Sequence, residues 1–416
     1  MRDELDKLRK EFESVRDAYG ARLTALEEKL ATMGVPATAA PAAPAPAQAA
    51  APPAAPAGAP PTQAAAPPVA VPVPPGAAGE GGPTGSLPVY SNASAMSKIF
   101  NPDIAVIGNF VGAGGSNSIN PTPAFGLDEA EATFQAVVDP YARADFFLSF
   151  SPEGVEIEEG FLTLTSLPGG LLAKVGKLKE QVGKVNTLHS HSLPWVDKPL
   201  MVQNLFGGEE GIADSGVSVS KLILNPIMFL EATGEVYAGT SDLFKSYQRS
   251  DVSWVGRLRG YRDVTESTNI DVGGSIAYGT NDAGPDFTTR LMGIDATVRY
   301  RPLRRAIYRR FQGRTELFWS KRGQESGTVD AFGMYGSAEY QFARRWFAGA
   351  RYDWSERNYD NSLVDKGPSL VLTYWPSEFS QIRGQYRRTR YAENVTANEV
   401  LFQFLFSIGA HGAHVF

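Results

Sequence analysis

The sequence contains no cysteine among its 416 residues. This absence excludes disulfide bonds, thiol catalysis, Cys-ligated zinc and iron–sulfur clusters, and it fits an oxidising envelope compartment. The sequence also lacks a run of eighteen or so apolar residues, which excludes a transmembrane helix. The formal net charge is -6, whereas a protein that binds phosphate backbones is basic, so nucleic acid is not an expected partner. The classes that remain possible are a soluble protein and a transmembrane β-barrel.

Catalytic motifs are also absent. The sequence has no G-x-S-x-G, H-E-x-x-H or Walker motif, so we do not expect an enzyme. The chain has only four histidines; His189 and His191, with Asp197 and Glu209, form a weak candidate for a zinc site. We therefore expect neither a metal nor a cofactor.

Residues 1–34 have the pattern of a coiled coil. Charged residues separate an apolar seam, which shifts register once and consists of Leu5, Leu8, Phe12, Val15, Tyr19, Leu23, Leu26, Leu30 and Met33. A helix of this length is marginal alone, so we expect it to oligomerise; a solitary helix packed on the rest of the chain is the alternative. The segment has no apolar signal-peptide core, so we interpret the chain as mature or recombinant, with its export signal missing.

Residues 35–96 are rich in Ala and Pro, especially up to about residue 85. Such a composition cannot bury a core and favours extended polyproline II, so we predict a disordered, semi-rigid spacer. At roughly 3 Å per residue the spacer would reach on the order of 100 Å or more.

Residues 97–416 alternate apolar and polar side chains in short runs, which is the pattern of antiparallel strands. We predict an all-β fold, a transmembrane barrel of about sixteen strands. The predicted strands are 103–114, 127–139, 141–150, 154–165, 170–181, 215–224, 227–239, 251–262, 268–279, 287–301, 307–320, 328–342, 345–356, 367–375, 379–391 and 397–410. An even number is typical of single-chain bacterial barrels.

The predicted connections alternate between tight turns and longer loops. Tight turns are expected at Asp139-Pro140, Pro168-Gly169, Asn225-Pro226, Ala343-Arg344 and Pro376-Ser377. Longer loops are expected at 115–126, 182–214, 240–250, 280–286, 321–327 and 357–366. This asymmetry is typical of an outer-membrane barrel whose short turns face the periplasm.

Side-chain parity assigns two faces to each strand. Met292, Ile294 and Val298 oppose Asp295 and Thr297, although a two-sheet sandwich would alternate in the same way. Aromatic residues near strand ends favour the barrel, because they would form an interface girdle: Tyr300, Trp319, Trp346, Trp354 and Trp375. The last strand is apolar on one face, and its parity continues to the terminal Phe416, which we interpret as a signal to the barrel-assembly machinery.

A basic strand with a glycine leads into the longest predicted loop. It reads Lys174-Val175-Gly176-Lys177-Leu178-Lys179 and is followed by Val182-Gly183-Lys184-Val185-Asn186. This run resembles the strand motif of phosphate-selective and related trimeric porins, and the resemblance extends over residues 100–416. It implies a sixteen-stranded, trimeric diffusion channel whose third long loop folds inward. The coiled coil and the spacer depart from that family, so no substrate preference follows.

We expect residues 182–214 to form the constriction loop. Its apolar residues, including Leu193, Trp195 and Phe206, indicate packing inside the wall rather than exposure to water; a subunit contact is the alternative. Polar candidates within this loop are Asp197, Glu209 and Glu210.

Charged residues expected to line the pore differ in sign along the chain. The acidic residues lie on early strands: Glu129, Glu131, Glu156, Glu231 and Glu235. The arginines lie on late strands: Arg257, Arg259, Arg299, Arg310, Arg314, Arg351, Arg383 and Arg387. Facing walls of opposite charge would create a transverse field, and the arginine excess indicates a mild preference for anions, although each charge could instead be structurally paired.

These patterns predict an outer-membrane porin for passive diffusion of small hydrophilic solutes, with a coiled coil extending into the periplasm. The expected partners are two further copies in a homotrimer, outer-membrane lipid, the barrel-assembly machinery and, through the coil, peptidoglycan or a periplasmic protein. The alternative is a structural anchor that tethers the outer membrane to peptidoglycan or another envelope layer.

Overall fold

The computed structural model describes residues 103–151 and 154–409. The predicted coiled coil (1–34), the predicted spacer (35–96) and Phe416 lie outside the described residues. Within the described ranges, no helix is long and apolar enough to cross a membrane.

Sixteen β-strands make up most of the described chain. They are β1 (Asp103–Ser116), β2 (Gly126–Asp139), β3 (Ala142–Ser151), β4 (Gly154–Leu167), β5 (Leu171–Lys179), β6 (Ala213–Leu222), β7 (Phe229–Tyr237), β8 (Ser253–Thr265), β9 (Thr268–Asn281), β10 (Gly284–Tyr300), β11 (Arg310–Gln324), β12 (Gly327–Ala343), β13 (Trp346–Arg357), β14 (Asp360–Ser377), β15 (Ser380–Arg390) and β16 (Thr396–Gly409). The largest difference from prediction is at β14, which begins at Asp360 rather than at residue 367.

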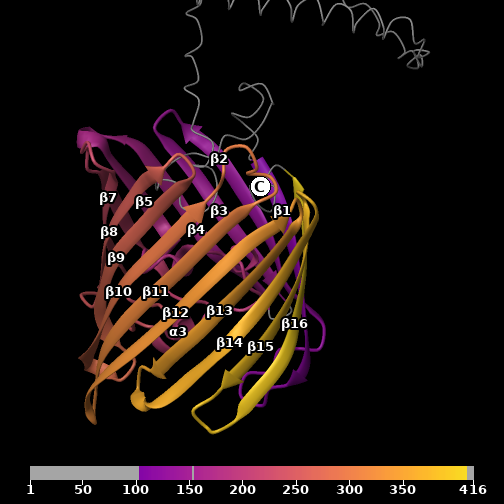
Figure 1. Cartoon of the computed structure of the whole chain (residues 1–416). Coiled ribbons are helices and arrows are strands. Elements are labelled where there is room, and N and C mark those ends of the chain that lie inside the picture. The colour runs from indigo at the N-terminus through magenta and orange to yellow at the C-terminus, as the bar shows by residue number, and fades with distance from the viewer. Residues whose placement is uncertain (1–102, 152–153, 410–416) are drawn as a thin grey trace, which may run out of the picture. The chain divides into compact units, whose positions relative to one another are not determined.

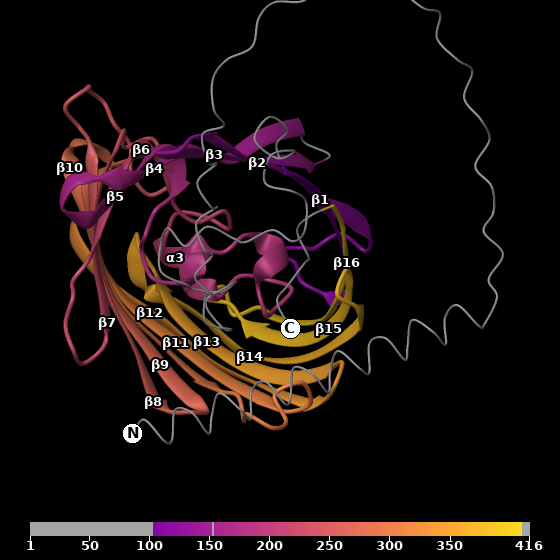
Figure 2. The same cartoon turned by 90° about the horizontal axis from the view of Figure 1, so that it is seen from above.

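The strands form one closed antiparallel barrel (Figures 1 and 2). Each strand pairs with its neighbours in the chain, and β1 pairs with β16 from Ala105 opposite Gly409 to Ser116 opposite Asn398. Closure leaves no strand edge unpaired, which is the condition for a sheet to cross lipid. The predicted sixteen-stranded transmembrane barrel is therefore confirmed, and a two-sheet sandwich is excluded.

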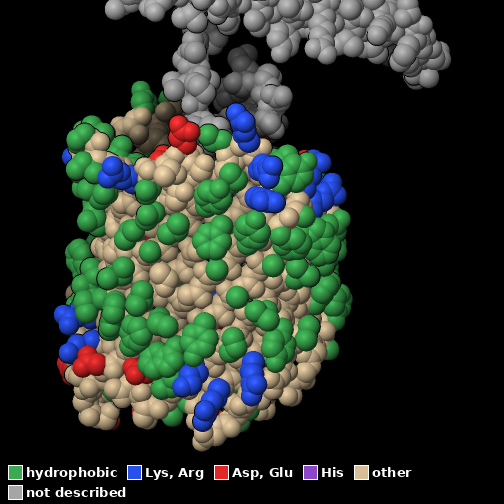
Figure 3. Space-filling model, viewed as in Figure 1, with side chains coloured by type: hydrophobic (Ala, Val, Ile, Leu, Met, Phe, Trp, Pro, Cys, Tyr) green, Lys and Arg blue, Asp and Glu red, His purple; other side chains and the backbone are tan. Residues whose placement is uncertain are grey.

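The two faces of the wall sort as their parity predicted. On β10, Met292, Ile294 and Val298 are exposed on the outside, whereas Asp295 and Thr297 are buried on the inside. Apolar side chains are spread over the outer surface in Figure 3, as a lipid-facing wall requires.

The aromatic girdle is predicted correctly at most positions but not at one. Tyr300, Trp319 and Trp346 are exposed on the outer surface. Trp375 is wrong as a girdle residue, because it is buried in a small apolar cluster with Ile107 and Leu405. Strand parity places Trp375 on the inward face with Thr373, and a position near a strand end does not override that parity.

The connections at one barrel rim, which we call the short-turn rim, are mostly brief: 140–141, 168–170, 223–228, 266–267, 301–309, 344–345 and 378–379. The opposite rim, the long-loop rim, carries the long connections 117–125, 180–212, 238–252 and 391–395. The tight turn predicted at Asn225-Pro226 is wrong, since six residues separate β6 from β7.

Three of the predicted long loops are also wrong. At 282–283, 325–326 and 358–359 the chain turns in two residues, because β9 to β14 continue beyond their predicted ends. Gly284 and Gly327 follow two of these turns at φ 145° and 114°, a backbone region that glycine adopts readily. The polar residues at these strand ends look like loop residues in sequence, yet they pair across the hairpins.

Candidate functional site

The segment between β5 and β6, residues 180–212, lies inside the barrel (Figure 2). We call it the inner loop. It contains two short 3-10 helices, η2 (Val185–Thr187) and η3 (Ser190–Ser192), and one helical turn and a half, α3 (Leu200–Leu205). A loop of this length within a barrel fills space that would otherwise hold water.

Apolar side chains of the inner loop pack against the inside of β11 and β12. Met201 and Phe206 are completely buried, and the Phe206 ring meets Phe318 edge-on with centroids 4.9 Å apart. Glycine makes room for this packing: a Cβ at Gly293 would lie 2.1 Å from the Phe318 ring, and one at Gly333 would lie 2.8 Å from Leu205 Cδ1. The apolar composition of the loop is thus accounted for by contacts with the wall.

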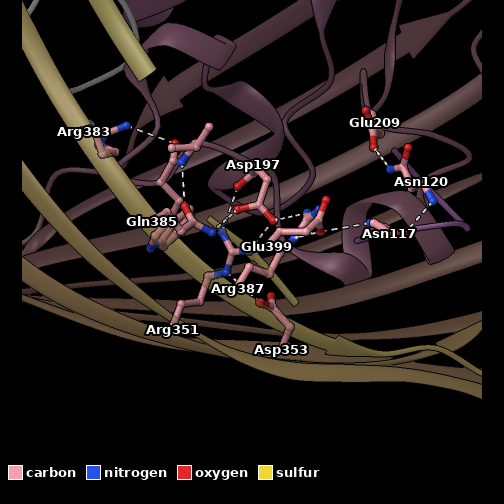
Figure 4. Close-up of polar contacts among 12 residues, drawn as sticks. Asn117, Asn120, Asp197, Glu209, Arg351, Asp353, Arg383, Gln385, Arg387 and Glu399 are labelled. Carbon is pink, nitrogen blue, oxygen red and sulfur yellow. Dashed lines mark hydrogen bonds and ion pairs between the residues drawn. The ribbon is translucent and has the colours of Figure 1, made fainter. Parts of the chain in front are cut away.

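Asp197 fastens the inner loop to the late strands (Figure 4). Its carboxylate accepts hydrogen bonds from Arg351 Nη2 at 3.0 Å and from Arg387 Nη1 at 2.8 Å. Burial alone would raise the pKa of Asp197, but the charges of Arg351 and Arg387 outweigh it and lower the pKa to about 2. Asp197 is therefore ionised at every physiological pH.

Arginines also hold the loop on either side of Asp197. The Arg351 guanidinium lies over the ring of Trp195, 4.8 Å from its centroid. Arg383 donates from Nη1 to the carbonyl oxygens of Leu193, at 2.7 Å, and Trp195, at 3.0 Å. These contacts fix the backbone as well as one side chain, so the position of the loop is set by the wall.

The start of the inner loop is fastened to β9 and β11. Glu316 on β11 accepts the backbone N–H groups of Lys184, at 3.1 Å, and Val185, at 2.8 Å. The Lys184 ammonium lies 3.4 Å from a carboxylate oxygen of Asp271 on β9. The loop is thus held at several separate points along its length.

The two histidines lie elsewhere than predicted. His189 contacts Glu131, Glu158 and Glu159, and His191 lies beside it. Burial alone would lower the pKa of His189, but the charge of Glu131 and hydrogen bonds to the glutamates outweigh it and hold the pKa well above the usual value.

The predicted partners of these histidines are engaged in other contacts. Asp197 binds the two arginines described above, and the exposed Glu209 accepts a hydrogen bond from Asn120. The exposed Glu210 offers its backbone oxygen to Lys198 at 3.1 Å. A zinc site formed with Asp197 and Glu209 is therefore wrong.

In the structure, the side chains of nearly all the predicted pore residues are buried or half-buried. Buried are Glu129, Glu131, Glu231, Glu235, Arg257, Arg314, Arg351, Arg383 and Arg387, and half-buried are Arg259, Arg299 and Arg310. Glu156 is exposed and pairs with Lys177 at 2.9 Å.

The late strands carry acidic residues as well as the predicted arginines, and several of these charges are paired. Arg259 pairs with Asp271 at 2.6 Å, Arg351 with Asp353 at 2.7 Å, and Arg387 with Glu399 at 2.6 Å. These acids occur at inward positions of the late strands. The prediction considered only the arginines there and left the acids out. Strand parity could have identified them, but their pairing depends on register.

The pair formed by Arg257 and Asp295 shows how register decides a contact. The two residues lie on β8 and β10, with β9 between them, and their side chains meet at 2.8 Å. Gly273 on β9 lies beneath this contact, where a Cβ would be 2.5 Å from each side chain. The missing side chain lets the ion pair cross one strand.

A basic segment near the short-turn rim contains four arginines that the prediction did not include. Seven arginines occur within residues 299–314. Arg301, Arg304, Arg305 and Arg309 are exposed in the connection between β10 and β11. They give this rim a local positive charge.

At the long-loop rim, a cavity of about 490 Å³ lies between the inner loop and the hairpin ends. Its lining includes Asn204 of α3 and two ion-paired arginines, Arg322 with Asp282 and Arg357 with Asp365. This polar space forms a vestibule above the packed part of the inner loop.

One known protein is similar to this chain in sequence. No family model matches the chain. An uncharacterized protein of Aquifex aeolicus is 28% identical, over 79% of this chain and 83% of that protein.

Solved structures of similar fold are outer-membrane proteins. OprB of Pseudomonas putida matches with a TM-score of 0.56 at 8% identity, covering 75% of this chain and 95% of that one. The anion-selective porin of Comamonas acidovorans matches with 0.53 at 10% identity, covering 74% and 99%. The outer membrane channel DcaP of Acinetobacter baumannii matches with 0.50 at 11% identity, covering 77% and 100%. At these identities the likeness establishes the fold, the porin-type barrel that the sequence resemblance indicated.

Proposed function

We propose that the protein is a porin of the bacterial outer membrane that allows passive diffusion of small hydrophilic solutes. The observation that supports this most is a closed barrel of sixteen strands with an apolar outside and a polar, charged inside. A channel accounts for this arrangement better than an enzyme does, because the inward charged groups are mostly engaged in holding the inner loop and one another.

The inner loop would act as the constriction. It is fastened at Asp197, at Lys184 and at the apolar contacts of α3, so it would narrow the lumen to a fixed width. The vestibule at the long-loop rim would admit solutes to this narrow zone.

A mild preference for anions remains part of the proposal, with a changed basis. The ion pairs on the late strands reduce the net charge of the wall, so the support comes chiefly from the exposed arginines of the short-turn rim. A positively charged mouth raises the local concentration of anions.

Planar bilayer recordings test both statements. The wild type should give discrete conductance steps and, in a salt gradient, a reversal potential of weakly anionic sign. Changing Arg301, Arg304 and Arg305 to Glu should shift this potential toward cations, and Arg249→Glu, a charge change at an exposed residue of the connection 238–252 on the opposite rim, serves as control. An unchanged potential would show that the rim does not set selectivity.

The tight packing of the inner loop favours a second candidate, a plugged barrel that anchors the outer membrane to another envelope layer. Met201, Val202, Leu205 and Phe206 have no exposed surface. Absence of conductance steps from correctly folded protein would favour this anchor over the porin.

We also propose a homotrimer, with the segment 1–34 as a periplasmic coiled coil. Three barrels around one axis would bring three tethered helices to an effective concentration of about a millimolar, which offsets the cost of helix nucleation. The barrel-assembly machinery and peptidoglycan remain proposed partners.

A further inference from the structure

Two histidines and three glutamates meet where the inner loop contacts the inside of β2 and β4. His189 Nδ1 lies 2.9 Å from Glu131 Oε2 and 2.8 Å from Glu158 Oε2. One ligand atom from each of these three residues lies within 4.8 Å of the other two. His191 Nδ1 lies 3.5 Å from the same Glu131 oxygen.

The far sides of these groups are held by other residues. Glu159 Oε2 lies 2.9 Å from His189 Nε2, so the ring is fixed with Nδ1 directed at the other two carboxylates. The Thr133 hydroxyl donates to Glu131 Oε1 at 2.9 Å, which leaves Oε2 directed toward the histidine. A carboxylate on the second nitrogen of a histidine is the usual outer support of a metal ligand.

The inner atoms of the cluster are buried and face one another. Oε2 of Glu131, Oε2 of Glu158 and Nδ1 of His189 are buried, and the histidine nitrogen lies 2.8 to 2.9 Å from both carboxylate oxygens. The Glu131 side chain is only 2% exposed. Two buried carboxylate oxygens this close together require a compensating cation, which is either a metal ion or a protonated His189.

The charges near this point are unequal. Four glutamates, Glu129, Glu131, Glu158 and Glu159, come together with two lysines. Lys179 Nζ lies 3.4 Å from Glu158 Oε2, and Lys198 is engaged with the backbone of Glu210. Before the histidines are counted, the excess charge is thus negative.

We propose that Glu131, Glu158 and His189, with His191 as fourth ligand, bind one divalent transition-metal ion, and that zinc fits best. Zinc takes imidazole nitrogen and carboxylate oxygen in four-coordinate sites. Calcium and magnesium require six or more oxygen ligands or retained waters, and this cluster offers fewer oxygens and two nitrogens. The ion would fasten the inner loop to β2 and β4, at a separate point from the Asp197 contact with the late strands.

Metal binding to the whole protein in detergent provides the first test. Protein stripped with a chelator and dialysed against zinc should retain one equivalent per chain by elemental analysis. Cobalt in place of zinc should give the strong visible absorption of a four-coordinate site with nitrogen and oxygen ligands, a readout that requires no variant and no channel activity.

Variants identify the ligands. Glu131→Gln and His189→Gln should reduce binding below one equivalent, and Glu159→Gln should weaken it by about 10- to 100-fold, because that residue only orients the ring. The double variant His411→Asn and His414→Asn removes the other two histidines of the chain and should bind normally. Circular dichroism confirms that each variant contains the barrel.

The competing state is a protonated His189 shared among the glutamates, with no metal. Two results would each overturn the proposal: no cobalt absorption from the unmodified protein, or full binding by His189→Gln. The unmodified protein decides the first point even if a variant does not fold.

Discussion

The contact of Asp197 with two arginines predicts how firmly the inner loop is held. Asp197→Asn preserves the size of the side chain but removes the charge that Arg351 and Arg387 share. Both arginines keep another acidic partner, Asp353 and Glu399 respectively, so the change affects chiefly the attachment of the loop.

The pKa of Asp197 gives the free energy by which this contact holds the inner loop. It is about 2 in the folded protein against an ordinary 3.8. One pKa unit corresponds to about 1.4 kcal/mol, so the ionised side chain is stabilised by roughly 2.5 kcal/mol, which is a factor of roughly 60 in the opening equilibrium of the loop. The side chain is 16% exposed, so solvent screening leaves this figure largely intact.

The pH dependence has a definite sign. Because folding lowers the pKa of this carboxyl group, its contribution is fully present above pH 3.8 and is lost as the pH falls toward 2. Wild type and Asp197→Asn should therefore differ at pH 7 and converge near pH 2.

Hydrogen exchange followed by mass spectrometry measures this opening. Peptides covering residues 193–206 should exchange roughly 60-fold faster in Asp197→Asn than in the wild type at pH 7, while peptides from β9 and β10 should not change. Glu209→Gln, which removes an exposed acid from the same loop, serves as the matched control. Equal exchange in Asp197→Asn and the wild type at pH 7 would refute the reasoning.

Three further predictions concern other parts of the chain. The protein should be a heat-modifiable oligomer with a circular dichroism spectrum dominated by strand, and a spectrum dominated by helix would contradict the fold. Gly183→Ala should destabilise the folded barrel by about 1–3 kcal/mol in thermal unfolding, because φ is 66° and a Cβ would lie 2.3 Å from Glu316 Oε2. Gly169 has φ 75° and open space around it, so Gly169→Ala measures the backbone part of that cost alone. Equal destabilisation by the two variants would show that the Glu316 side chain moves aside without cost. Residues 1–34 alone should assemble poorly, whereas the tethered segment forms a parallel trimer; a stable free dimer at micromolar concentration would contradict this.

The strands were predictable because their signal is local. Alternation with period two assigns each side chain to a face, and it identified all sixteen strands and the inward position of Asp295 and Arg383. The hairpin ends at 282–283, 325–326 and 358–359 were missed, because polar residues in paired hairpins and in loops have the same composition.

The interior was predictable only in part, because its contacts join distant residues. The apolar residues of 182–214 correctly indicated a packed loop, but nothing local shows that Asp197 meets Arg351 across 154 residues. The same holds for His189, whose partners are glutamates on β2 and β4 rather than the acids of its own loop. Register and barrel closure, which a single sequence does not display, determine these pairs.

The junction between β1 and β16 bears on how the protein reaches its folded state. Gln403 on β16 donates to Asn109 on β1 at a separation of 294 residues, whereas every other strand pairs with its immediate neighbour in the chain. Strand pairs between residues so far apart in the sequence form slowly, because the chain loses the entropy of joining distant segments before it gains the hydrogen bonds of the pair. Until that step, β1 and β16 each present an unpaired edge that invites aggregation. Substitutions at this junction should therefore act mainly on the yield and rate of assembly, and those at the tight hairpins mainly on the finished barrel.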